Sequence, residues 1–485
     1  MAALHLIKTL ATRYGSDEQV TRLVDQQVTY IVPRLNPDGA ALALAPDPRY
    51  VRSGTRHYPH EERRDGLHAR DMDGDGRILQ MRIVDPTGDW RVSDAEPRLM
   101  VKRRPDEHGG TYYRLLPEGE IENYDGHLIK IAPPLMGLDF NRNFPAAWRP
   151  EGKQRGAGDY PGSEPEIRAV LDFMAAHPNV FGAITFHTYS RAILRPFGDK
   201  PDEEMDTDDL WTLEAIGRIG TEITGYPCVS VYHHFRYHPK EVITGVFDEW
   251  LYEHEGVLAF TVELWDLATA AGVEEKNNEK RFIDWFRLHP REDDEKIAAF
   301  VSESSPTGLV EWRTFEHPQL GTLEIGGWDT MYTWRNPPPS LLEAEIAPHS
   351  DFVLAFAGLA PRLVVTDFSA QALGDGVYRL VAIVENHGFL ATYGTNQAKT
   401  MAAVKPVRVE LGLAGGTTLR SGEARRDIEH LEGRANKLSA AYYGSSPTDH
   451  RAKVEWVVEG VAGDDVNLTV RSERAGTVRT RTVLP

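Results

Sequence analysis

An asparagine and an arginine stand side by side in the stretch LDFNRNFP, at Asn141 and Arg142. The planar guanidinium of an arginine can hold a carboxylate through two parallel hydrogen bonds, and an adjacent amide adds a neutral donor. Such a pair can bind the free carboxylate of a ligand. The simpler alternative is a surface turn in which Asp139 and Arg142 form an ion pair.

A single histidine, His187, follows the apolar run at 180–186. A histidine after a strand is more often structural than a ligand. The carboxyl ends of strands in an α/β sheet, however, are where such folds place their sites. This position strengthens the case for a ligand role of His187 but leaves the structural alternative open.

Three aspartates alternate in the stretch DMDGDGRI, at Asp71, Asp73 and Asp75. Alternating carboxylates with a glycine between them resemble the first half of a calcium-binding loop. The glutamate that completes such a loop at its twelfth position is missing, because Arg82 stands there. The pattern leaves two interpretations open: bound Ca²⁺, or a turn built on aspartate side chains.

Five blocks of the chain resemble, in their order, the zinc carboxypeptidases of the carboxypeptidase A type. They are NPDG at 36–39, LDFNRNFP at 138–145, YPGSEPE at 160–166, ITFHTYS around His187 and FTVELWD around Glu263. The resemblance covers about residues 1–360. It implies a mixed, largely parallel sheet flanked by helices, and hydrolysis of the last peptide bond of peptides that have a free C-terminal carboxylate.

The resemblance also implies roles for single residues. Asn141 and Arg142 would hold the terminal carboxylate of the peptide, and His187 would be the third ligand of a catalytic Zn²⁺. Tyr189 would line the substrate pocket. Glu263 would be the general base, which takes a proton from metal-bound water and delivers it to the leaving amine.

Glu324 is the alternative general base, since it lies nearer the last helix of the predicted α/β domain. The run from Asp248 to Gly256 leads into Glu263 and favours Glu263. A further arginine, which in the resembling family polarises the scissile carbonyl, is expected upstream of the Asn-Arg pair. The candidates lie within residues 98–104.

Specificity depends on how the segment before Trp250 aligns with the family. Without a gap, Asp248 falls at the base of the pocket for the terminal side chain, where a carboxylate prefers lysine or arginine. One gap places Phe247 there instead, and this favours apolar terminal residues.

The family's first zinc-binding histidine and its glutamate come from a His-x-x-Glu motif, roughly forty residues before the NPDG block. Asn36 leaves no room for that motif, and the His-x-x-Glu strings at 238–241 and 289–292 stand in the wrong order. The chain as written thus supplies one zinc ligand of three. Two hypotheses compete: a zinc metallocarboxypeptidase whose motif lies upstream of Met1, or a non-catalytic relative that binds peptide C-termini. An amidase-like relative that acts on cell-wall or modified peptides is a further alternative.

Apolar periodicity indicates which elements position these residues. The run at 28–35, which ends at the NPDG turn, predicts a buried strand, and the runs at 180–186 and 257–261 predict two more. Helical stripes at 167–174 and 208–224 alternate with the strands, as in an α/β domain. Charged, Gly/Pro-rich segments at about 49–134 and 267–318 are predicted to be insertions into this domain, which spans 1–360.

After residue 361 the pattern changes to period two, for example at 377–384, 407–413 and 466–470. Alternating apolar residues with Gly and Asp turns between them predict a β-sandwich. We expect residues 361–485 to be an accessory domain without a catalytic group.

The composition excludes several classes. With 54 basic and 73 acidic residues the net charge is −19, which argues against a nucleic-acid partner. No apolar run approaches the roughly 18 residues that a membrane span needs, and no signal peptide is visible. The single cysteine, Cys228, excludes an internal disulfide framework and fits a reducing, cytoplasmic compartment. The oligomeric state is left open.

Overall fold

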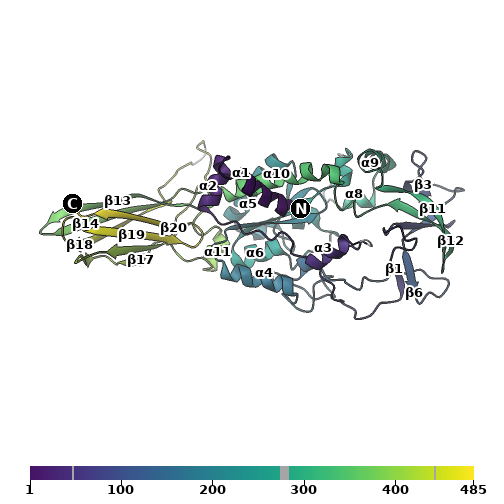
Figure 1. Cartoon of the computed structure of the whole chain (residues 1–485), viewed down its shortest axis with the longest axis horizontal. Coiled ribbons are helices and arrows are strands. Elements are labelled where there is room, and N and C mark those ends of the chain that lie inside the picture. The colour runs from purple at the N-terminus through teal and green to yellow at the C-terminus, as the bar shows by residue number, and fades with distance from the viewer. Residues whose placement is uncertain (46–47, 274–282, 442–443) are drawn as a thin grey trace.

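The computed structural model describes residues 1–45, 48–273, 283–441 and 444–485. Three parts lie in a row along the long axis of the molecule (Figure 1). A β-sandwich occupies one end, a four-stranded sheet with helices on both faces lies in the middle, and a six-stranded antiparallel sheet forms the other end. None of the helices in the described ranges is long and apolar enough to cross a membrane.

The central sheet has the strand order β7-β10-β8-β9, and it is mixed. β7 runs parallel to β10, β10 antiparallel to β8, and β8 parallel to β9, so the predicted mixed, largely parallel sheet is confirmed. Its strands are β7 (Gly182–Thr188), β8 (Ala192–Arg195), β9 (Cys228–Ser230) and β10 (Leu258–Leu264).

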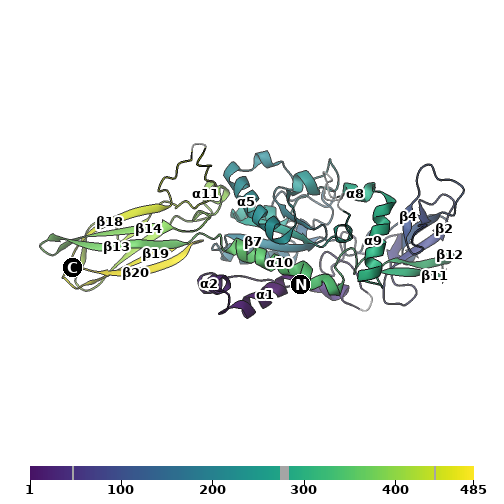
Figure 2. The same ribbon diagram turned by 90° about the horizontal axis from the view of Figure 1, so that it is seen from above.

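Helices cover both faces of this sheet. Leu258, Phe260 and Val262 of β10 pack in one apolar cluster with residues of α5 and α10, whereas Ala259 packs in another with residues of α4 and α6. α1 and α2 lie outside α10 (Figure 2). The helices of this part are α1 (Ala2–Arg13), α2 (Glu18–Gln26), α3 (Pro37–Ala43), α4 (Pro165–Ala176), α5 (Thr207–Thr224), α6 (Phe247–Glu255) and α10 (Pro339–Ala357), with shorter turns η1 (Phe140–Arg142), η2 (Asp202–Glu204) and η3 (Val231–Phe235).

The strand predicted at 28–35 is not formed. These residues are extended but belong to no strand, and Val28 and Val32 are 68% and 61% exposed. β7, the outermost strand of the central sheet, pairs only with β10 among the described residues. Apolar periodicity cannot make a strand without a hydrogen-bonding partner, and this prediction was wrong.

The two predicted insertions build one sheet together. β2, β3, β4 and β5 come from the first insertion, while β11 and β12 come from the second and the residues after it, in the order β11-β12-β2-β5-β3-β4. The strands are β2 (Gln80–Val84), β3 (Trp90–Val92), β4 (Met100–Lys102), β5 (Tyr113–Pro117), β11 (Leu309–His317) and β12 (Gly321–Trp328). They are accompanied by the pair β1 (Gly66–Ala69) and β6 (Gly119–Glu122) and by helices α7 (Leu267–Ala270), α8 (Asp284–Arg287) and α9 (Arg291–Ser304).

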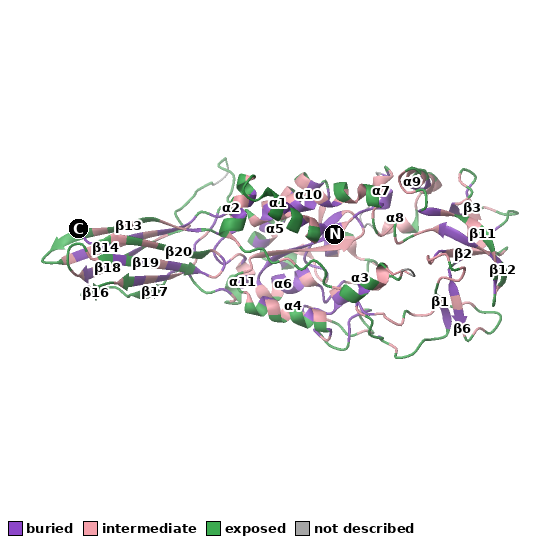
Figure 3. Cartoon of the chain, in the orientation of Figure 1, coloured by how far each residue is buried: buried purple, intermediate pink, exposed green. Residues whose placement is uncertain are grey.

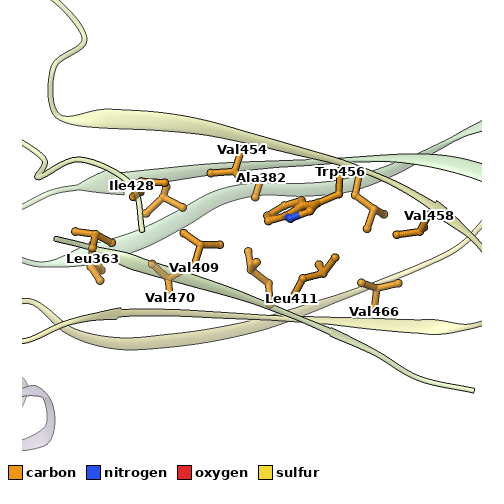
Figure 4. Close-up of a cluster of buried hydrophobic side chains, with 14 of the residues drawn as sticks. Leu363, Ala382, Val409, Leu411, Ile428, Val454, Trp456, Val458, Val466 and Val470 are labelled. Carbon is orange, nitrogen blue, oxygen red and sulfur yellow. The ribbon is translucent and has the colours of Figure 1, made fainter. Parts of the chain in front are cut away.

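The C-terminal part is a sandwich of two four-stranded antiparallel sheets, as the period-two pattern predicts. Alternate side chains of the strands fill the space between the sheets, around the buried Trp456 (Figures 3 and 4). One sheet contains β13 (Leu363–Gly374), β14 (Val377–Asn386), β18 (Arg451–Glu459) and β16 (Thr418–Ser421). The other contains β17 (Arg425–Asp427), β15 (Arg408–Leu413), β19 (Asp465–Ser472) and β20 (Gly476–Val483). Along the chain, the short helix α11 (Asn396–Thr400) follows β14 and precedes β15.

The sandwich is joined to the central part at the C-terminal end of α6. Arg474 donates hydrogen bonds to the carbonyls of Glu255 and Gly256, at 2.7 and 2.8 Å. Gly256 has a left-handed backbone, and a side chain there would collide with Ala398 of α11. This close approach explains why a glycine ends α6.

Candidate active site

His187 and Glu263 are direct neighbours in the parallel register of β7 and β10. Because side chains alternate along a strand, Glu263 points to the same face as Ala259, the face covered by α4 and α6. Each is the second-last residue of its strand, so the two lie together at the carboxyl edge of the sheet. The structure therefore brings these two predicted residues together.

The Asn-Arg pair lies on η1, which is held from both ends. The Asp139 carboxylate accepts the Asn141 backbone N–H at 3.0 Å, and Phe140 packs in the cluster beneath α4 and α6. The Asn141 side-chain oxygen accepts the backbone N–H of Phe247 at 2.9 Å, which ties η1 to the start of α6. This leaves the amide nitrogen of Asn141 as the donor for a ligand.

Arg142 is not part of a surface turn, because it is only 5% exposed. Its nearest described carboxylate is Asp139, at the loose distance of 3.8 Å, while Arg52 reaches the same carboxylate at 3.0 Å. The alternative of a simple surface ion pair therefore does not describe this site. Two arginines share one aspartate and carry excess positive charge.

The electrostatics of the site follow from burial. Removal from water raises the pKa of Glu263 to about 8, against the opposing effect of Arg52 and Arg142. The same cause lowers the pKa of His187 to about 4, so its imidazole is neutral. One carboxyl oxygen of Glu263, Oε2, is buried without a hydrogen-bond partner in the described structure. An unsatisfied buried oxygen of this kind calls for a ligand or water.

Asp248 and Tyr189 border the same region. Asp248 is 2% exposed on the first turn of α6, and desolvation raises its pKa to about 6, while the Arg142 charge opposes that shift. Burial raises the pKa of Tyr189, whose ring packs edge-on against Phe286.

Sequence reasoning missed Arg52. The candidates at 98–104 belong to the distant six-stranded sheet, where Arg98 pairs with Glu96 at 2.8 Å. Arg52 instead forms an isolated parallel bridge with Asp139, and its charge acts on Glu263 and His187. Arg52 follows the NPDG block closely, and this position could have indicated that it belongs with the site. The prediction that an insertion begins at about residue 49 removed Arg52 from consideration.

Glu324, the alternative base, lies elsewhere. It is on β12 of the six-stranded sheet and pairs with Arg82 at 2.8 Å. It therefore does not share a site with His187, and Glu263 is the carboxyl that does.

A model of the zinc carboxypeptidase family matches residues 1–283, which is more than half of the chain. The chain belongs to the zinc carboxypeptidase family. A second model, a domain of unknown function (DUF8731), matches residues 362–483, which form the sandwich.

Among curated proteins, the chain is similar to carboxypeptidase A4 of Mus musculus, with 31% identity over 144 residues, 27% of this chain and 32% of that protein. It is also similar to carboxypeptidase B2 of Rattus norvegicus, with 30% identity over 147 residues, 27% of this chain and 33% of that protein. The chain spans about a third of the length of these relatives. The solved structure of thrombin activatable fibrinolysis inhibitor is similar with a TM-score of 0.32 and 18% identity, over 55% of this chain and 50% of that chain.

The family name implies zinc, and a catalytic zinc site needs three protein ligands. The neutral imidazole of His187 suits such a ligand. Within the described ranges, however, three or more acidic, histidine or cysteine donors converge at one place only, and that group does not include His187. The described residues of this family member therefore do not complete a zinc site by themselves.

The acidic loop differs from the prediction. The converging group is Asp71, Asp73 and Glu118, without Asp75. The guanidinium of Arg313 lies 2.9 and 2.8 Å from the carboxylates of Asp73 and Asp75. The Asp71 carboxylate accepts the backbone N–H groups of two following glycines. These contacts fit a turn built on aspartate side chains, and they give the Ca²⁺ interpretation no support.

Proposed function

We propose that the residues gathered at the carboxyl edge of β7 and β10 form the active site of a metallocarboxypeptidase and that this site binds peptides by their free C-terminal carboxylate. The observation that carries the proposal is the buried Arg142, which lies beside Asn141 and acts electrostatically on both Glu263 and His187. Membership of the zinc carboxypeptidase family supports the same reaction class.

The terminal carboxylate would bind to Arg142 and to the free amide nitrogen of Asn141. A buried guanidinium whose nearest acid is 3.8 Å away is favourable for a carboxylate, because the ligand supplies a closer counter-charge. Arg52, which lies against Asp139, would stabilise negative charge that develops on the peptide carbonyl. This role is the one expected of the family's carbonyl-polarising arginine.

Glu263 would hold and move the proton in the reaction. A carboxyl with a pKa of about 8 exchanges its proton near neutral pH, as a general acid–base residue must. Zinc, when bound, would activate the attacking water, and His187 would be one of its ligands. The remaining ligands are not among the described residues.

Asp248 would select the terminal side chain. Its carboxyl is buried and within reach of the Arg142 charge, and a basic terminal residue would pair with it and favour its ionised form. We therefore propose a preference for peptides that end in lysine or arginine. If Phe247 formed the base of the pocket instead, apolar terminal residues would be preferred, and the ratio of rates or affinities for the two peptide classes distinguishes them.

The binding test compares one peptide with a free C-terminal carboxylate and the same peptide with an amidated terminus. The free acid should bind the chain at least tenfold more tightly, since a charge-assisted bidentate contact is lost on amidation. Arg142→Gln should abolish the difference, while Arg168→Gln on the outer face of α4 should keep it. Equal affinities for the two peptides in the unsubstituted chain would contradict the proposal.

The catalytic test joins a segment with a His-x-x-Glu motif upstream of Met1. That protein should bind one zinc and release single residues from peptide C-termini, whereas the chain as given should bind zinc weakly and hydrolyse nothing. Glu263→Gln should keep the zinc but lose about 10²–10⁴ in rate, and His187→Ala should lose the zinc. Zinc-dependent hydrolysis by the chain as given would contradict the ligand argument.

A non-catalytic peptide-binding protein is the second candidate, favoured by the single zinc ligand among the described residues. It predicts the same preference for free carboxylates but no hydrolysis in either protein. An amidase-like relative that acts on cell-wall or modified peptides would differ only in which peptides are cleaved.

A further inference from the structure

Arg335 lies in the loop that follows β12, and this loop reaches the carboxyl edge of the central sheet. The Thr188 hydroxyl, next to His187, donates a hydrogen bond to the Arg335 carbonyl. The Arg335 guanidinium lies over the ring of Tyr50, 3.6 Å from its centroid. Backbone anchoring and ring stacking together fix the position of this guanidinium.

Arg335 is anchored next to the register pair of His187 and Glu263. Thr188, whose hydroxyl donates to the Arg335 carbonyl, directly follows His187 on β7. Its register partner on β10 is Leu264, which directly follows Glu263. The backbone of Arg335 is therefore held at the carboxyl edge of the sheet, one residue beyond both His187 and Glu263.

Arg335 differs from Arg52 and Arg142 in its partners. Arg52 and Arg142 both approach Asp139, at 3.0 and 3.8 Å. No carboxylate within the described ranges lies within 4 Å of Arg335. The side chain is half-buried, in a chain with a net charge of −19. A fixed, partly desolvated guanidinium without an acid is suited to bind the acid of a ligand.

We infer that Arg335 binds a second carboxylate of the ligand, on the side chain of one of the two residues that precede the terminal residue. The inference rests on the proposed function, in which Arg142 and Asn141 hold the terminal carboxylate. With that end fixed and the last peptide bond at Glu263, the preceding residues pass Tyr189, where Arg335 is stacked on Tyr50. The preferred substrates are then peptides with a glutamate or aspartate just before the terminal residue.

The test measures the affinity of the full chain for acetylated peptides that share their C-terminal residue. One series carries Glu and the other Gln at the penultimate position, and a second pair carries them one residue earlier. The Glu peptide of at least one pair should bind about three- to tenfold more tightly, and the difference should shrink at high salt. Equal affinities within both pairs would overturn the inference.

Substitutions locate the effect. Arg335→Gln should remove the Glu/Gln difference, Arg335→Lys should keep part of it, and Arg313→Gln on β11, whose partners are Asp73 and Asp75, should leave it unchanged. A difference that persists in Arg335→Gln would also overturn the inference.

Amidated peptides separate this result from the proposed function. If the free and amidated forms bind alike, the proposed function fails, and the inference fails with it. If the free acid is preferred while Glu and Gln peptides bind equally, only the role of Arg335 is lost. In Arg335→Gln, a retained preference for the free acid shows that the site is intact.

Discussion

Two apolar, extended segments of this protein have opposite environments. β14 of the sandwich pairs on one side with β13 and on the other with β18, and its alternate residues Leu380, Ala382 and Val384 are fully buried. Residues 28–35, where Tyr30 packs against Phe173 of α4, pair with no strand of the described chain and expose Val28 and Val32. Burial and pairing, and not apolar content, therefore decide which segment becomes a strand.

The core of the sandwich gives the largest expected effect. Trp456 is 2% exposed, fills the space between the two sheets and donates its indole N–H to the Glu423 carbonyl at 2.8 Å. Trp456→Ala should lower the free energy of unfolding by about 3–5 kcal/mol, because it leaves a large cavity. Val461→Ala, at a residue that is 69% exposed, is the control and should change it by less than about 0.5 kcal/mol. Urea denaturation measures both free energies of unfolding. Similar losses in the two variants would mean that Trp456 is not packed between the two sheets.

The same contrast shows what can be predicted from sequence. In the sandwich, one face of each strand is buried against the other sheet, so period two alone predicted β14, β15 and β19, although β14 pairs with the distant β18 and β15 with the distant β19. In the α/β part, the helix at 208–224 was predicted within one residue, because Asp206 caps its start and Gly225 ends it. The strand at 28–35 failed because pairing is a long-range property that a local pattern does not contain.

The site shows the same division. Asn141, Arg142, His187 and Glu263 were predicted from short blocks whose spacing is local, and their roles stay predictions. The position of Arg335 could not be predicted, since it follows a sheet assembled from segments more than two hundred residues apart.

The junction between the sandwich and the central part depends on Arg474. It is 6% exposed, and it donates to the carbonyls of Glu255, Gly256 and Tyr393. Arg474→Met keeps most of the volume but leaves buried carbonyls without donors, and it should cost about 2–4 kcal/mol of unfolding free energy.

Arg471→Met is the matched control for the junction. Arg471 lies on β19 and forms an exposed ion pair with Glu410 at 3.2 Å, which should be worth less than about 1 kcal/mol. If the Arg474 variant were as stable as the control, the two parts would not be coupled through α6, and each could be treated as an independent folding unit.

The carboxyl groups of Glu249 and Asp199 lie together, and this pair predicts how stability depends on pH. Glu249 on α6 is fully buried, and burial, followed by the Asp199 charge, raises its pKa well above the usual range. Above the ordinary glutamate pKa of roughly 4.3, the unfolded chain releases this proton while the folded chain keeps it. Stability should therefore fall as pH rises towards the raised pKa, by up to about 1.4 kcal/mol per pH unit for one proton.

Glu249→Gln should remove this part of the slope, because the amide cannot ionise and still offers an N–H to Asp199. Glu222→Gln, at an exposed position on α5, is the control and should keep the slope. Thermal unfolding between pH 5 and 8 measures all three proteins. An unchanged slope in Glu249→Gln would mean that the pair does not hold a proton.

The smallest expected effect is the one that can break the comparison between the two segments. Val32 is 61% exposed in the unpaired segment, whereas Val454 on β18 is 1% exposed in the sandwich core. The same substitution, valine to alanine, should cost about 2 kcal/mol at Val454, through lost burial and a residual cavity, and less than about 0.5 kcal/mol at Val32. Amide hydrogen exchange should agree, with fast exchange throughout 28–35 and slow exchange in β18, because only the latter amides donate to a neighbouring strand. If Val32→Ala cost as much as Val454→Ala, the segment at 28–35 would be a buried, paired strand in solution.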